Sequence, residues 1–263
     1  MSGLFDLTGK VALITGSSKG IGRAIAEEMA RHGAQVVISS RKGDICQEVA
    51  DGINAELEGQ PGGAVAIPAH IGHKEELQRL VDETCAQLGK IDILVCNAAV
   101  NPFYGSMADL PDDAFDKILS VNIQSNHWLA QMVLPQMVER NAGSVIIVSS
   151  VGGLKGSPVL GAYCISKAAD VQLVRNLAVE YGPHNITVNA ISPGLVRTDF
   201  ARALWDSPER TEAAVKSYPM GRLGEAEDVA GIAVYLGAKA GAWTTGQTFV
   251  IDGGKMSAGG DYN

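Results

Sequence analysis

The sequence has little of what would point to a membrane, a secretory route or a nucleic-acid partner. Its longest apolar runs, such as residues 145–148, are far too short to cross a bilayer. The first residues lack the charged and apolar regions of a signal peptide. Lysine and arginine number 21 against 29 aspartate and glutamate residues, a formal net charge of −8, and no basic cluster stands out. We therefore expect a cytoplasmic protein with neither nucleic acid nor a membrane as partner.

Cysteine is also scarce, with Cys46, Cys85, Cys96 and Cys164 as the only four. They show neither a CxxC spacing nor another metal-binding pattern, so we expect free thiols in a reducing compartment and no metal site. Cys164 directly follows Tyr163, but no histidine partner for cysteine chemistry is apparent, and a structural role is expected for it.

What the chain does have is a regular alternation of short apolar, β-branched runs with longer helical stretches. The runs are continuously apolar, as in parallel strands covered on both faces. Expected strands cover 10–15, 35–39, 64–68, 91–96, 144–149, 186–191 and 248–251. Expected helices cover 21–31, 44–57, 74–88, 112–140, 163–181 and 227–236. This rhythm predicts an α/β protein with a doubly wound parallel sheet, the Rossmann fold.

No linker or shift in composition divides the 263 residues. We expect a single domain over residues 1–263 with its core at about 7–254. Two stretches are expected to be irregular. One is 192–218, of which 199–218 could act as a lid, and the other is a flexible glycine-rich tail at 257–263.

Three glycines, Gly16, Gly20 and Gly22, follow the first expected strand just as a helix begins. Glycine lets the backbone approach a pyrophosphate, and the helix N-terminus offers free N–H groups and a positive dipole end. The spacing GxxxGxG differs from the GxGxxG dinucleotide fingerprint. A merely tight strand–helix turn is the alternative, but the strand–turn–helix context favours a phosphate-binding loop.

Small residues end the fourth expected strand, at Asn97, Ala98 and Ala99. They leave room for a flat ligand at the carboxyl edge of the sheet. The alternative is that they only make room for a packed helix.

A polar cluster fit to move a proton lies downstream. Tyr163 and Lys167 are four residues apart, hence on one face of a helix, and Ser150 ends a strand before them. A free tyrosine has a pKa of about 10, and a neighbouring ammonium lowers that pKa. A hydroxyl at Ser150 could hydrogen-bond a substrate carbonyl. Ser149 is the alternative hydroxyl, but strand alternation turns adjacent side chains to opposite faces.

These motifs, taken in order, resemble those of the short-chain dehydrogenases/reductases. The resemblance rests on the Thr15-Gly-x-x-x-Gly-Ile-Gly22 loop, Asn97-Ala-Ala, Ser150, Tyr163-x-x-x-Lys167 and Pro193-Gly194, and it spans about 7–254. It implies hydride transfer between a nicotinamide cofactor and a small-molecule ketone, aldehyde or secondary alcohol. Tyr163 would be the general acid in reduction and the general base in oxidation.

The resemblance assigns further roles. Lys167 would lower the pKa of Tyr163 and bind the nicotinamide ribose, and Ser150 would orient the carbonyl. Asn122 matches the family asparagine that holds a water in the proton relay. The implied cofactor-binding set is Gly16, Ser18, Lys19, Gly20, Ile21, Gly22, Ser40, Arg41, His70, Ile71, Asn97, Ala98, Ala99, Tyr163, Lys167, Pro193, Gly194, Val196 and Thr198.

One position departs from the family. Many members carry an aspartate after the third strand, where it meets the adenine, and this chain reads Ala69-His70-Ile71 there. His70 could stack on the adenine or donate to it instead. The alternative is a surface histidine.

The cofactor is expected to be NADP(H). NAD sites place an acid about 20 residues beyond the glycine loop, at the ribose 2′-hydroxyl. This chain reads Ser39-Ser40-Arg41-Lys42 there, with no acid until Asp44. Arg41 suits a 2′-phosphate, and Lys19 could approach it from the other side. If both are only solvated cations, an NAD-dependent alcohol dehydrogenase of the same family is the alternative.

Two further function classes stay open. One is a catalytically inactive, dinucleotide-sensing regulator, although such proteins typically lose the tyrosine or the lysine. The other is a methyltransferase with a related glycine loop, in which the Tyr163–Lys167 cluster has no role. Candidate walls of a largely apolar substrate pocket are Pro102, Phe103, Tyr104, Leu154, Val159 and Leu160. Lid residues that could close over them are Phe200, Leu204 and Trp205.

A homotetramer is expected. Residues 97–105 and 39–42 resemble the tetrameric carbonyl and retinal reductases of the family. The helices expected at 112–140 and 163–181 carry apolar residues on more than one face, whereas one sheet contact buries only one. These residues are Ile118, Trp128, Leu129, Met132, Val171, Leu173 and Val174. The resemblance pairs these helices between subunits and places strand 248–251 at another dyad. The alternative is a well-covered monomer.

Overall fold

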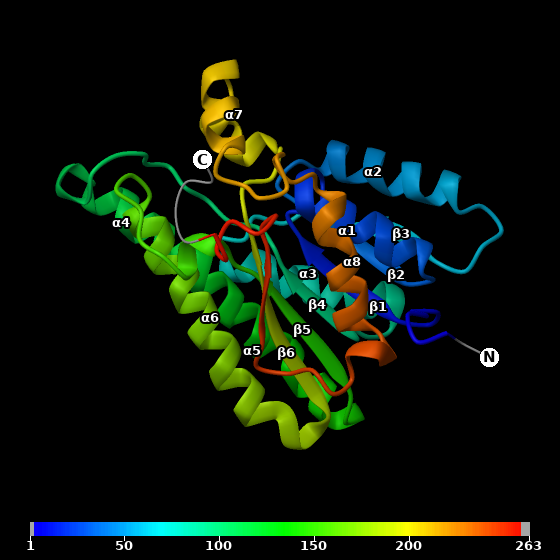
Figure 1. Ribbon diagram of the computed structural model, residues 1–263. Coiled ribbons are helices and arrows are strands. Elements are labelled where there is room, and N and C mark those ends of the chain that lie inside the picture. Colours follow the sequence, from blue (N-terminus) through cyan, green and yellow to red (C-terminus); the bar gives the residue numbers. More distant parts are fainter. Residues whose placement is uncertain (1–2, 259–263) are drawn as a thin grey trace.

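Seven parallel strands form one sheet in the computed structural model, which describes residues 3–258 (Figure 1). The strand order is β3-β2-β1-β4-β5-β6-β7. The strands are β1 (Val11–Thr15), β2 (Gln35–Ser39), β3 (Gly63–Ala66), β4 (Ile93–Cys96), β5 (Gly143–Val148), β6 (Ile186–Pro193) and β7 (Thr248–Ile251). The order reverses between β1 and β4, which is the point where doubly wound sheets bind ligands. The predicted fold class is confirmed.

Helices cover both faces of the sheet. They are α1 (Gly20–Arg31), α2 (Gly43–Glu56), α3 (Lys74–Leu88), α4 (Asp112–Leu119), α5 (Ser125–Arg140), α6 (Gly161–Tyr181), α7 (Pro208–Val215) and α8 (Glu227–Gly237). α1, α2 and α8 pack on one face, and α3, α5 and α6 on the other. Alternate residues of each strand point to opposite faces. In β1, Ala12 and Ile14 join the first core and Leu13 joins the second. This double coverage explains why the strands are apolar throughout.

The helix expected at 112–140 is interrupted. α4 and α5 are joined by one turn of π-helix, η2 (Ser120–Gln124), in which the Ser125 N–H donates to the Ser120 carbonyl five residues back. Such turns often occur at functional sites. Asn122 lies in this turn and is fully buried.

The expectation of an irregular stretch at 192–218 is wrong. β6 continues to Pro193, and a 3-10 segment, η5 (Asp199–Leu204), and helix α7 follow. Ser207 caps α7 by accepting a hydrogen bond from the Arg210 N–H at 3.2 Å, and Pro208 occupies the first turn. These are ordinary helix-start signals. We call residues 199–218 the lid segment. Of the tail expected to be flexible, residues 259–263 lie outside the described part of the chain.

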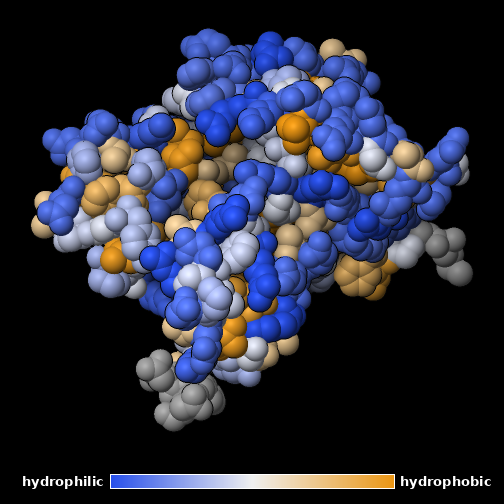
Figure 2. Space-filling model, turned by 90° about the horizontal axis from the view of Figure 1, so that it is seen from above, coloured by the Kyte–Doolittle hydropathy of each residue, from blue (hydrophilic) through white to orange (hydrophobic). Residues whose placement is uncertain are grey.

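Polar side chains dominate the face seen from above, with apolar side chains in patches between them (Figure 2). Within the described part of the chain, none of the helices combines the length and apolar character needed to span a membrane. All four cysteines are free thiols, and three of them are buried.

Candidate active site

The carboxyl ends of β1 and β4 are tied together beside the glycine loop. The Thr15 hydroxyl accepts hydrogen bonds from the backbone N–H of Asn97 at 3.1 Å and of Ala98 at 3.2 Å. The Asn97 side chain donates to the carbonyls of Thr15 at 2.9 Å and Gly16 at 3.2 Å. The Asn97 side chain therefore shapes the loop, and Ala98 and Ala99 leave the space beside it.

Glycine is required at several places in this loop. Gly16 and Gly20 have φ of +66° and +58°, a region that L side chains rarely adopt. A Cβ at Gly22 would come within 2.5 Å of the Gly16 carbonyl oxygen. A Cβ at Gly20 would lie 3.1 Å from the Thr198 side chain, so the loop meets the segment after β6.

The N-terminus of α1 is open toward this loop. Its N-cap residue, Lys19, makes no side-chain capping bond. The backbone N–H groups of Gly20, Ile21 and Gly22 have no acceptor within residues 3–258. Free donors at a helix N-terminus are what an anionic phosphate needs. A pyrophosphate therefore fits the residues present.

The residues expected at a 2′-phosphate differ in their surroundings. The Arg41 side chain is exposed and makes no hydrogen bond or ion pair with any described residue. The Ser40 hydroxyl lies 3.1 Å from the Cys46 thiol. Lys19 is paired with Asp199 in η5, with Nζ 3.0 Å from Oδ2. Sequence reasoning missed Asp199, which lies 180 residues away along the chain.

His70 is held by local contacts after β3. Its ring stacks on the ring of His73, with centroids 4.4 Å apart and an interplanar angle of 17°. Its Nδ1 accepts from the Gly72 N–H at 3.1 Å. Its own N–H donates to Glu76 at 2.7 Å. His70 and the following Ile71 are partly exposed.

Tyr163 and Lys167 share one face of α6, as their spacing predicts. The Lys167 Nζ lies 5.8 Å from the centroid of the Tyr163 ring. Ser150 comes from the turn after β5, where its Oγ accepts from the Gly152 N–H at 3.0 Å. Ser149 points elsewhere, because its hydroxyl donates to the Lys167 carbonyl at 2.8 Å. Ser150 is thus the hydroxyl that faces the tyrosine.

Burial raises the pKa of Tyr163. The Lys167 ammonium and a hydrogen bond with Ser150 oppose this rise in pKa, and Asp170 adds to it. Lys167 therefore acts in the expected direction, but burial outweighs it, and the phenol keeps its proton at neutral pH.

Lys167 is buried and doubly bound. Its ammonium donates to the Val148 carbonyl and to Asp170 Oδ2, each at 2.9 Å. Burial alone would lower the pKa of Lys167, but attraction to Asp170 and Tyr163 reverses the effect and raises it. Sequence reasoning missed Asp170. Its signal was a carboxylate three residues after Lys167, among the otherwise apolar and small residues of a covered helix face.

The Asn122 side chain is fully engaged. Its Oδ1 accepts from the Val100 N–H at 2.8 Å, and its Nδ2 donates to the Val100 carbonyl and to the Ser166 hydroxyl, each at 3.0 Å. Its backbone carbonyl accepts from the Asn126 side chain at 2.8 Å. Asn122 therefore fixes the loop after β4 against α6.

The lid segment reaches the tyrosine. The Phe200 ring lies 6.0 Å from the Tyr163 ring, centroid to centroid. The two segments that carry expected pocket walls also meet, since the N–H of Gly105, next to Tyr104, donates to the Val159 carbonyl at 3.0 Å. The Trp205 Nε1 is buried without a partner in the part of the chain that the structure describes.

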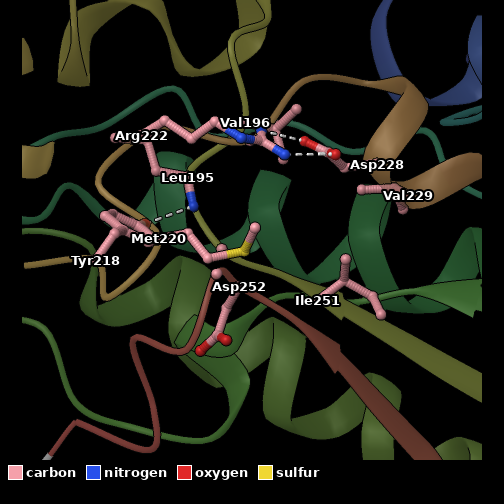
Figure 3. Close-up of a pocket in the computed structure, with 12 residues that line it drawn as sticks. Leu195, Val196, Tyr218, Met220, Arg222, Asp228, Val229, Ile251 and Asp252 are labelled. Atoms are coloured by element: carbon pink, nitrogen blue, oxygen red, sulfur yellow. Dashed lines mark hydrogen bonds and ion pairs between the residues drawn. The ribbon is translucent and has the colours of Figure 1, made fainter.

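The segment after β6 is anchored to β7 and to the end of the lid segment. The Gly194 N–H donates to the Ile251 carbonyl at 2.9 Å, and the Leu195 N–H donates to the Tyr218 hydroxyl at 2.8 Å. Behind this segment lies a small cavity of about 150 Å³ (Figure 3). The cavity is walled by Val196 and Met220, among others, and does not include the tyrosine. Two of its lining residues, Gly194 and Val196, belong to the expected cofactor-binding set.

Comparison with known proteins links the chain to dehydrogenases and reductases. A family model described as "Enoyl-(Acyl carrier protein) reductase" matches residues 16–256. "Dehydrogenase/reductase SDR family member 4" of Bos taurus is 42% identical over 251 residues, covering 95% of this chain and 88% of the bovine protein. The protein of the same name from Sus scrofa is 44% identical over the same length and coverage.

Solved structures are similar over almost the whole chain. A short-chain type dehydrogenase/reductase from Mycobacterium marinum is 38% identical, with a TM-score of 0.88, covering 96% of this chain and 97% of that one. A gluconate 5-dehydrogenase from Burkholderia cenocepacia J2315, in complex with NADP and tartrate, is 30% identical, with a TM-score of 0.91, covering 97% and 98%.

Proposed function

Because the chain belongs to the short-chain dehydrogenase/reductase family, we propose that it is an NADP(H)-dependent oxidoreductase acting on a ketone, an aldehyde or a secondary alcohol. The observation that carries this proposal is one juxtaposition. Tyr163, Ser150 and Lys167 lie at the carboxyl edge of the sheet, beside a glycine loop whose free N–H groups suit a pyrophosphate.

Each side chain has a role in the proposed reaction. A bound nicotinamide cofactor would supply the hydride in reduction and accept it in oxidation. Tyr163 donates its phenolic proton to the carbonyl oxygen in reduction and removes the hydroxyl proton in oxidation. Ser150 donates a hydrogen bond to the carbonyl oxygen, where negative charge develops. Lys167 holds a positive charge beneath the phenol and favours the phenolate that forms.

The preference for NADP(H) rests on Arg41. Its guanidinium is exposed at the end of β2 and has no partner within residues 3–258, and the neighbouring positions lack an acid. A guanidinium is suited to a phosphate but offers nothing specific to a ribose hydroxyl. The Burkholderia cenocepacia relative binds NADP, which supports the same assignment. We place Ser40 beside the 2′-phosphate as well.

The remaining predicted contacts with the cofactor are also proposals, and they rest on the same family membership. Pro193, Gly194, Val196 and Thr198 would flank the nicotinamide, and His70 and Ile71 would lie near the adenine. For substrate, the expected apolar walls at 102–104, 154 and 159–160 and the ring of Phe200 favour a hydrophobic carbonyl compound.

A panel of carbonyl compounds, assayed by loss of NADPH absorbance, tests this function. We expect turnover with at least one apolar aldehyde or ketone, and slower turnover when NADH replaces NADPH. Binding of NADPH without turnover on any compound would favour the inactive, dinucleotide-sensing regulator instead.

We also propose that the chain is one domain in a homotetramer of a cytoplasmic enzyme. Apolar side chains remain exposed on α6 and near β7. Val179 is 82% and Trp243 100% exposed, although both are apolar. A second copy would cover them. The free thiols agree with a reducing cytoplasm. Light scattering at micromolar concentration should give four times the chain mass, and a monomer mass would rule the tetramer out.

A further inference from the structure

A buried ion pair lies next to Tyr163, the proposed proton donor. The Lys167 and Asp170 side chains are 2% and 0% exposed, and Nζ lies 2.9 Å from Oδ2. The other carboxylate oxygen accepts from the Asn126 side chain at 2.9 Å. Asn126 in turn donates to the backbone carbonyl of Asn122 at 2.8 Å. A continuous chain of hydrogen bonds therefore runs from Lys167 through Asp170 and Asn126 to the π-turn.

Burying this ion pair costs free energy, which suggests that the pair has a functional role. Removing a carboxylate and an ammonium from water carries a large desolvation penalty. Apolar residues of similar size in the same place often give a fold that is equally stable or more stable. A buried lysine without a counter-ion tends to lose its proton. Here both oxygens of the Asp170 carboxylate accept a hydrogen bond. Lys167 uses two of its three N–H donors, one for Asp170 and one for the Val148 carbonyl. The third donor has no acceptor among residues 3–258.

We propose that Asp170 is a positioning residue of the active site, which holds the Lys167 ammonium in place and charged while offsetting part of its field at Tyr163. This proposal rests on the proposed function of Tyr163 and Lys167. Asn126 has a supporting role, because its side chain orients the Asp170 carboxylate and links it to the π-turn that carries Asn122.

The sign of the effect follows from the charges around the pair. A negative charge makes a proton harder to remove from either Tyr163 or Lys167. The other titratable groups acting on them are Cys164, on α6 itself, and Cys96, from β4. Burial raises the pKa of both thiols, so both are neutral at physiological pH. Asp170 is thus the one anion acting on this pair among residues 3–258. Whichever group loses its proton first, loss of Asp170 lowers the pH at which this happens.

Two variants test the proposal. Asp170→Asn removes the charge at constant shape. The double variant Asp170→Leu with Asn126→Leu replaces the polar pair with apolar side chains and leaves no side-chain amide unpaired, although the Asn122 carbonyl loses the Asn126 donor. Glu180→Gln removes an exposed carboxylate from the same helix and is the matched control. The readout is an NMR titration of the lysine Cε and tyrosine Cζ signals in ¹³C-labelled protein, with Lys167→Arg and Tyr163→Phe used for assignment.

We expect the first deprotonation of the Tyr163–Lys167 pair to move to lower pH by at least about one unit in both variants, and not in Glu180→Gln. The apparent pKa of the kcat/KM profile should move in the same direction. An unchanged titration in a folded variant, or a shift to higher pH, would overturn the proposal. If neither variant folds, the wild-type titration decides, since a Lys167 that loses its proton below pH of about 10 contradicts it. The NMR readout needs no turnover. A protein that is inactive on every carbonyl compound would therefore contradict the proposed function and leave the Asp170 proposal to be decided by the titration.

Discussion

The ammonium of Lys19, in the glycine loop, lies 3.0 Å from the carboxylate of Asp199, at the start of the lid segment. Both side chains are 66% exposed. The hydrogen bond from Lys19 lowers the pKa of Asp199, so the carboxylate is ionised at neutral pH. A 2′-phosphate would therefore compete with Asp199 for Lys19, and the lid and the loop are coupled through one exposed ion pair.

Asp199→Asn should free Lys19 for the cofactor. We expect the Kd for NADPH to fall by about two- to fivefold, as befits an exposed pair, and the Kd for NADH to stay the same. The gain should shrink at high salt, because exposed charges are screened. Fluorescence titration measures both constants. Asp206→Asn, which breaks an ion pair with Arg210 inside the same segment, is the control. A gain for NADH as large as for NADPH would show that Lys19 does not select the phosphate.

Arg41→Asp should reverse the cofactor preference. A charge-assisted hydrogen bond contributes roughly 1.5–3 kcal/mol, so we expect kcat/KM with NADPH to fall by about ten- to a hundredfold. The value with NADH should fall little or rise. Arg175→Asp, at an exposed arginine of α6, controls for net charge. Equal losses with the two cofactors would remove Arg41 from the 2′-phosphate site.

Asp228 should stabilise the fold in a pH-dependent way. Arg222 donates two hydrogen bonds to it, at 2.6 and 2.8 Å (Figure 3), and with the Glu225 N–H lowers its pKa from 3.8 to about 2. A lowered carboxylate pKa stabilises the fold above pH of about 4, and the contribution is lost as the pH falls toward 2.

The pair is partly exposed, so we expect Asp228→Asn to cost less than about 1 kcal/mol at neutral pH. Roughly half of this difference should remain at pH of about 3. Urea midpoints of both proteins at the two pH values measure it. A difference that grows on acidification would contradict the assignment.

The sheet was predictable because its central strands, covered on both faces, are continuously apolar. The predicted ranges 35–39 and 248–251 coincide with β2 and β7, and 74–88 coincides with α3. The helical structure of the lid segment was missed for a local reason. Its helix α7 has no buried residue, so apolar periodicity is weak there, and only the Ser207-Pro208 start signal marked it.

The site was predictable where it rests on short-range spacing. Tyr163 and Lys167 meet because they are one helical turn apart. The partners of Lys19 and Asp170 depend on elements that meet only in the folded chain, η5 in one case and α5 in the other. The π-turn at Asn122 likewise has no marker in the sequence, since glycine and proline are absent from residues 120–124.

The account depends most on Tyr163 as the group that moves the proton, and Tyr163→Phe tests this directly. The variant removes one hydroxyl and keeps the ring that packs against Phe200. Once the carbonyl panel has supplied a substrate, single-turnover oxidation of bound NADPH should be measured for both proteins. We expect unchanged NADPH binding and a rate lower by about 10²–10⁴-fold, the usual contribution of a general acid. A rate close to that of the wild type, with NADPH bound equally well, would contradict the account.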